Sequence, residues 1–109
     1  MRINPRELRY KIKIQKPIDS FDEDNRPVPE WHTFLEPRAK VVNISGEEFD
    51  IAKGIGVKIV KTFYIRFRKN IEIEEGDRIL YKGKKYNIKY INNMEEQNRY
   101  LEIKTEYIA

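Results

Sequence analysis

The stretch ILYKGKKYNIKYI, residues Ile79–Ile91, decides the fold of this chain. Apolar and polar residues alternate on both sides of Lys82-Gly83-Lys84, and successive side chains of a β-strand point to opposite faces. The alternation therefore predicts two half-buried strands that form a hairpin, and Gly83 can adopt the positive φ that a tight turn requires. The residues that share a face within each strand are Ile79 and Tyr81, then Tyr86, Ile88 and Tyr90.

Alternating segments on both sides of this hairpin predict four further strands. These segments are Arg9–Lys16, Trp31–Val42 with a break at Pro37, Val57–Arg68, and Arg99–Tyr107. We expect Pro17 to end the first strand, because proline has no N–H to donate to a strand ladder. The acidic, proline-containing segment Ile18–Glu30 is then predicted to be a long connecting loop.

One short helix is expected between the second and third strand regions, over about Gly46–Lys53. Ser45 and Glu48 have the spacing of a capping box, and Ile44 and Phe49 have that of a hydrophobic staple. A helix of two turns is not stable alone in water, so it must dock on another surface. The predicted fold is therefore all-β: a small antiparallel six-stranded barrel with one short helix, forming a single domain over residues 1–109.

Composition narrows the class of protein. The chain has 109 residues, no cysteine and a net charge of +4, so we expect neither disulfides nor thiolate zinc sites. No apolar run approaches the ~20 residues of a membrane helix, and we expect a protein made in the cytoplasm that does not bind membranes. Lys and Arg alternate with apolar residues in the strand regions, where they are the usual outward-facing residues.

The residue types needed for catalysis are missing or badly placed. His32 is the only histidine, no glycine-rich phosphate loop is present, and Asp22–Asp24 lack the glycine of a calcium loop. We therefore expect no catalytic, metal-binding or cofactor-binding residues, and no enzyme. A barrel that binds single-stranded nucleic acid is the alternative. Three tyrosines beside basic residues could stack on bases: Tyr64, Tyr86 and Tyr90. Tyr86 and Tyr90 fit the core equally well.

The order of short motifs resembles the head–tail joining proteins of long-tailed bacteriophages and prophages, also called head-closure or adaptor proteins. The resemblance runs from Leu8 to about Glu106. The motifs are Leu8-Arg9, Gln15-Lys16-Pro17, Trp31, Ala39-Lys40-Val41, Ile44-Ser45-Gly46 with Glu48, Ile65-Arg66-Phe67-Arg68, Ile71, Gly76-Asp77-Arg78-Ile79, and Tyr81–Ile88.

This resemblance implies a structural protein of the virion that forms a ring, commonly of twelve copies. The ring would join the portal or connector protein to the tail and line the DNA exit channel. Contact with packaged DNA would be independent of sequence and made to phosphates, with Lys58, Lys61, Arg66 and Arg68 as candidates. Residues expected to face the channel or a neighbouring subunit are Asn43, Ser45, Glu47, Glu48, Phe49, Lys53 and Gly54. The Ile18–Glu30 loop is expected to become ordered on assembly.

Overall fold

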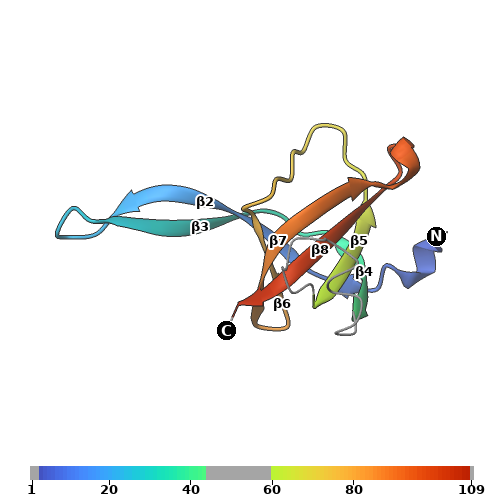
Figure 1. The fold of residues 1–109 in the computed structure, drawn as a ribbon, viewed down its shortest axis with the longest axis horizontal. Helices are drawn as coiled ribbons and strands as arrows, with labels where there is room; N and C mark the ends of the chain where they lie inside the picture. The colour runs from blue at the N-terminus through green and yellow to red at the C-terminus, as the bar shows by residue number, and fades with distance from the viewer. Residues whose placement is uncertain (1–2, 44–59, 109) are drawn as a thin grey trace.

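The structure is a computed structural model, and it describes residues 3–43 and 60–108. Two 3₁₀ turns are present in this part of the chain, η1 (Pro5–Glu7) and η2 (Met94–Glu96), together with strands that make one antiparallel sheet (Figure 1). The strands are β1 (Tyr10–Lys11), β2 (Lys13–Phe21), β3 (Pro27–Leu35), β4 (Arg38–Asn43), β5 (Lys61–Arg66), β6 (Arg78–Tyr81), β7 (Lys84–Asn93) and β8 (Tyr100–Ile108).

The sheet curls, and the chain passes directly from β1, at one end of the sheet, to β2, next to the strand at the other end. The strand order is β1-β4-β5-β8-β7-β6-β2-β3, although β1 and β2 are separated in sequence only by Ile12. The Ile12 N–H donates to the carbonyl of Pro37 at 3.0 Å, between β3 and β4. The all-β antiparallel prediction is confirmed. The count of six strands is wrong: the described residues form eight, because the first two predicted strand regions divide, at Ile12 and at Pro37.

The predicted central hairpin is confirmed as β6 and β7. Its turn places Lys82 at φ +50° and Gly83 at φ +76°, and two consecutive positive φ values are the property of a type I′ turn. Ile79 pairs with Tyr86 across the two strands, and both side chains are buried, as is Ile88. The turn residues and the alternation therefore specify the same pairing register for β6 and β7, and the burial of one face stabilises that register.

The main core lies on the inner face of the curled sheet. Phe63 is fully buried at its centre and makes edge contacts with Tyr81 and Tyr86, at centroid distances of 5.6 and 5.7 Å. Such edge-to-face pairs add to the free energy gained by burial. The core residues come from nearly every strand: Ile12, Ile14, Ala39, Phe63, Ile65, Ile79, Tyr81, Tyr86, Ile88 and Ile103.

The expected loop Ile18–Glu30 is instead most of a long β-hairpin, formed by β2 and β3. Strand β2 continues through Pro17, which pairs with Trp31, and ends at Phe21, which pairs with Pro27. The prediction that Pro17 ends the strand is therefore wrong. Strand β6 pairs only with Lys13–Gln15, so one edge of β2 has no neighbouring strand beyond that point, and a free edge tolerates proline.

A tight turn closes this hairpin. The Asp22 N–H donates to the Arg26 carbonyl at 3.0 Å, and the Asp22 carboxylate accepts from the N–H groups of Asp24 and Arg26 at 2.9 Å. Figure 1 shows the hairpin projecting from the curled sheet, on the side away from η1 and η2. We call residues 18–30 the arm and the rest of the described chain the body. The predicted helix, Gly46–Lys53, lies outside the described residues.

Candidate functional site

The candidate sites among the described residues are surface hollows and the projecting arm. Within residues 3–43 and 60–108, no group of three His, Cys, Asp or Glu side chains is placed to hold a metal ion. His32 is exposed on β3. In the same part of the chain, no helix has the length and apolar character needed to cross a membrane.

The predicted DNA contacts do not form one patch. Lys61 begins β5 and pairs with Thr105, whereas Arg66 ends β5 and pairs with Tyr100. Five residues of strand separate them by roughly 16 Å. Arg68 follows Arg66 at the same end. Of the predicted interface residues, Asn43 is described and ends β4. The remaining predicted residues lie outside the described residues: Ser45, Glu47, Glu48, Phe49, Lys53, Gly54 and Lys58.

At its own end of β5, Lys61 belongs to a cluster of three lysines, which we call the lysine cluster. Lys61 donates to the side chain of Asn43 and shares a hollow of about 360 Å³ with Lys82 and Lys84. Burial lowers the pKa of the Lys61 ammonium, and the charges of Lys84 and Lys82 lower it further. Within the described chain, none of the three forms an ion pair with a carboxylate. An anion in this hollow would relieve the repulsion among them.

Tyrosine rings surround the lysine cluster. Lys61 lies 6.0 Å from the ring centroid of Tyr86, Lys82 lies 5.4 Å from that of Tyr10, and Lys84 lies 5.9 Å from that of Tyr107. Tyr86 is a core residue, and burial raises the pKa of its hydroxyl. Tyr10 and Tyr107 are the exposed rings of this group. Of the three tyrosines that the sequence suggested as stacking platforms, Tyr64 and Tyr86 are buried and Tyr90 is half-buried.

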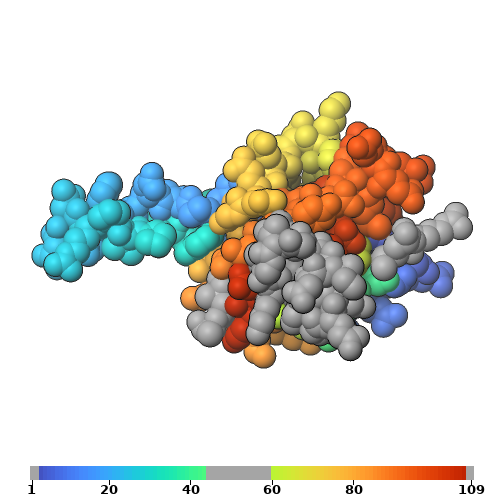
Figure 2. Space-filling view, viewed as in Figure 1, coloured from blue at the N-terminus to red at the C-terminus, as the bar shows by residue number. Residues whose placement is uncertain are grey.

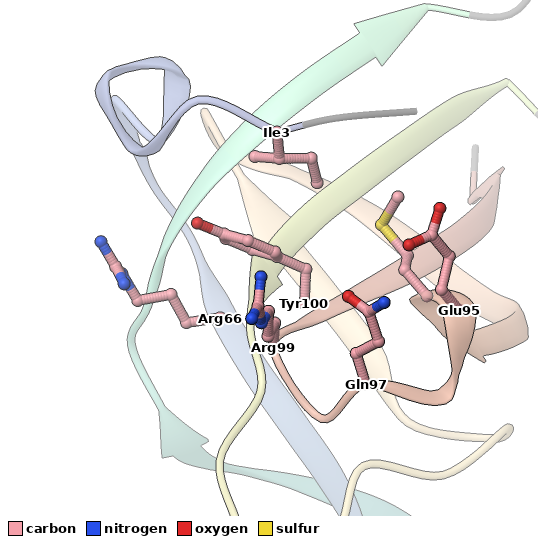
Figure 3. A pocket seen from close by; sticks show the side chains of 7 residues that line it. Ile3, Arg66, Glu95, Gln97, Arg99 and Tyr100 are labelled. Carbon is pink, nitrogen blue, oxygen red and sulfur yellow. The ribbon is translucent and has the colours of Figure 1, made fainter.

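The opposite end of β5 carries a second surface, lined by arginines. Two hollows of about 730 and 340 Å³ share Arg66 as a wall, and we call them together the arginine groove. Figure 3 shows the larger hollow, with Arg66 and Arg99 near Tyr100. The arginines that line the groove are Arg38, Arg66, Arg68 and Arg99. In the described residues, no carboxylate forms an ion pair with any of them.

The floor of the arginine groove is apolar. Ile3 and Leu8, from the segment around η1, pack on Tyr64 in a second hydrophobic cluster that covers the outer face of β5. The Tyr64 hydroxyl donates to Glu102 at 3.0 Å, and burial together with Glu102 raises the pKa of Tyr64. The groove thus combines apolar floor residues with a rim of arginines. Its apolar lining residues are Ile3, Pro5, Leu8, Pro37 and Met94.

The root of the arm is held to the body by a polar network. The buried Gln15 donates its amide N–H to the Thr33 hydroxyl at 3.0 Å and accepts from Arg78 Nε at 2.7 Å. The Arg78 guanidinium lies 4.2 Å from the ring centroid of Trp31. These contacts tie both strands of the hairpin to β6.

A second contact fixes the same root to the loop before β6. Lys16 Nζ lies 3.0 Å from the Asp77 carboxylate and 4.9 Å from the ring centroid of Phe34. Asp77 is 3% exposed and also accepts from the Glu74 N–H at 2.9 Å. Together with the Gln15 network, these contacts hold the root of the arm against the body.

Beyond its root, the arm is exposed on all sides. Figure 2 shows it standing clear of the body, and every residue from 21 to 30 is exposed. Phe21 is 62% exposed, and Ile18 and Val28 are also largely exposed. Large apolar side chains that project into solvent close together are typical of surfaces that bind another molecule.

Comparison with known proteins gives the family. The family model described as phage head completion protein matches residues 3–107. The chain belongs to this family. It is thus a structural protein of the phage head, and its place is the virion. The resemblance seen in the sequence is confirmed.

Two solved structures share the fold of this head completion family member. One is the solution structure of protein SF1141 from Shigella flexneri 2a, with 25% identity, 98% of each chain covered and a TM-score of 0.69. The other is a chain in the virion of a native gene transfer agent particle, with 14% identity, 99% and 97% coverage and a TM-score of 0.59. Among curated proteins, no match was found.

Sequence reasoning missed the partners of its own candidates. Lys82 and Lys84 were visible as basic residues of the hairpin turn, but only the pairing of β6 and β7 beside β8 and β5 brings them to Lys61. Arg38 and Arg99 likewise reach Arg66 through sheet order. A usable signal existed for the arm, because Ile18, Phe21 and Val28 are large apolar residues in a segment otherwise rich in acidic residues.

Proposed function

We propose that this head completion protein closes the filled head as one subunit of a ring at the head–tail junction. In this position it joins the portal or connector protein to the tail protein and lines the DNA exit channel. The family match over residues 3–107 carries the proposal. A rigid sheet body with a projecting, exposed arm suits a subunit that must contact several neighbours at once.

The lysine cluster is the part of the described surface best suited to DNA. Lys61, Lys82 and Lys84 place three positive charges around one hollow, and phosphate contacts of this kind carry no sequence information. This assignment keeps Lys61 from the sequence prediction and replaces its predicted neighbours, since Arg66 and Arg68 lie at the other end of β5.

Electron microscopy tests the ring. The full chain is mixed with the portal and connector proteins of the same phage, and rings on the portal axis are expected. Solitary particles at high concentrations of all components would contradict the proposal.

Packaged DNA tests the lysine cluster. Particles that carry Lys61→Gln, Lys82→Gln and Lys84→Gln together should still assemble but should release more nuclease-sensitive DNA than the wild type. A control of equal charge change combines three exposed lysines that do not line the hollow: Lys11→Gln, Lys69→Gln and Lys85→Gln. Equal DNA release from the two triple variants would remove the cluster from the proposal.

A free single-strand binder remains the competing function, and it has its own test. Such a protein would bind short single strands as an isolated chain, with log affinity falling linearly against log salt concentration. We expect no such binding, because Tyr64 and Tyr86 are buried and Tyr90 is half-buried. Salt-sensitive binding that is lost when the exposed Tyr10 and Tyr107 are changed to alanine would favour the competing function instead.

A further inference from the structure

The arm carries a strong negative charge for its size. Residues 18–30 contain five acidic residues and one arginine, a formal charge of −4. Asp22 is used within the turn. No described residue forms an ion pair with the other four, which are Asp19, Glu23, Asp24 and Glu30. The arm therefore offers unpaired carboxylates beside the exposed Phe21 and Val28.

The arm is poorly suited to pairing through its backbone. Strand β3 is the last strand of the sheet order, so its outer edge is free. Pro27 and Pro29 lie on it and remove two N–H donors. Prolines on an edge strand discourage the addition of another strand. The edge of β2 beyond Gln15 is free as well, and Pro17 removes one N–H donor from that strand. We therefore expect recognition by the arm to use side chains, namely an aromatic residue surrounded by carboxylates.

The arginine groove has the complementary chemistry. Its apolar floor can cover an aromatic ring, and its arginines have no acidic partner among the described residues. Each hollow is also lined by one carboxylate: Glu36 in the smaller hollow, 4.0 Å from Lys13, and Glu95 in the larger one. The four arginines outnumber these two acidic residues. Arginine pairs well with carboxylates because its planar group donates two parallel hydrogen bonds.

We propose that the arm tip of one copy docks in the arginine groove of a second copy, with Phe21 on the apolar floor and the acidic residues on the arginine rim. This inference deepens the proposed function, on which it rests, by naming the contact between ring neighbours. The arm projects away from η1 and η2, near which the groove lies (Figure 1), and its root is fixed, so it does not reach its own groove. Two different surfaces that meet head to tail generate a ring when the rotation closes.

Covalent trapping tests the contact directly, because the chain has no cysteine of its own. Full-length Glu23→Cys protein, at the arm tip, is mixed with Gln97→Cys protein, at the groove, under mild oxidation. A disulfide-linked heterodimer is expected, and a chain with both changes should give a ladder of multimers. The control is Lys85→Cys, an exposed residue that lines neither hollow. Equal linkage of Glu23→Cys to both proteins, or none to Gln97→Cys, overturns the proposal.

Charge reversal tests whether the arm and the groove recognise each other through their charges, with the yield of the linked heterodimer as the measurement. Arg66→Glu with Arg68→Glu, added to the Gln97→Cys chain, should reduce heterodimer yield at least tenfold. Asp19→Lys with Asp24→Lys, added to the Glu23→Cys chain, should restore it. All four positions are exposed, so the fold should survive. Failure of the reversed pair to restore linkage overturns the proposal.

The two proposals fail separately. If rings form on the portal but arm and groove do not cross-link, the ring function stands and the arm–groove contact is wrong. If arm and groove cross-link in the purified chain but no ring forms on the portal, the contact stands and the proposed place at the head–tail junction is wrong.

Discussion

The body and the arm are both antiparallel sheet from one chain, yet their apolar residues have opposite surroundings. Ile88 in the body is 2% exposed, whereas Ile18 in the arm is 46% exposed. The body buries its apolar residues among several strands, while two strands alone have no second layer to cover theirs. The arm therefore depends on its ladder, its turn and its anchored root. Its apolar side chains are free for contact with another molecule.

The largest expected effect comes from making the same substitution, isoleucine to aspartate, once in the body and once in the arm. Ile88→Asp puts an unpaired charge in the core and should cost about 4 kcal/mol or more, enough to unfold a domain of ordinary stability. Ile18→Asp should change the free energy of unfolding by no more than about 0.5 kcal/mol, because the site is already in water. Urea denaturation followed by circular dichroism measures both. Equal losses would mean that the arm is part of the folding core.

An intermediate effect is expected at the junction of the two regions. Asp77→Ala removes the acceptor of Lys16 Nζ and of the Glu74 N–H, and the loss of hydrogen bonds to a charged group costs about 2 kcal/mol. The variant should also loosen the arm, seen as lower ¹⁵N order parameters for residues 18–30. Asp19→Ala, on the arm itself, is the control and should alter neither quantity. An arm that stays rigid in Asp77→Ala would show that Gln15 and Arg78 suffice to hold it.

The smallest expected effect is a loss of folding stability at alkaline pH. It comes from a tyrosine of the body, since the arm contains no tyrosine. The pKa of Tyr64 is raised by burial and by Glu102 above the ordinary tyrosine value of 10.0. Above about pH 10 the unfolded chain loses this proton first, so stability falls as pH rises. Tyr64→Phe should be about 1 kcal/mol less stable than wild type at pH 7, because it loses the hydrogen bond to Glu102. That difference should shrink by pH 11 in urea titrations. A constant difference across this range would contradict the assignment.

Much of the body could be predicted from the sequence because its signals are local. Alternation and turn chemistry identified β6, β7 and β8, and Pro37 marked the break before β4. The arm could not be predicted in the same way, because its prolines and acidic residues are typical of loops. Pairing with Trp31 and anchoring by Arg78 overrode that local preference. Of the residues that line the two proposed surfaces, the sequence named Lys61, Arg66 and Arg68. It did not group them with Lys82, Lys84, Arg38 and Arg99, which reach them only through the sheet order.

The sequence by itself determined the class of fold, the central hairpin and the phage head family, because periodicity, turn residues and motif order are all local properties of the chain. Only the tertiary structure decided that the acidic segment is a rigid arm, that Lys61 joins Lys82 and Lys84, and that Arg66 lies with Arg38 and Arg99. These groupings arise from the strand order of the curled sheet, which brings together residues far apart in sequence. Strand order is set by how all the apolar faces share one core, and no single segment encodes it.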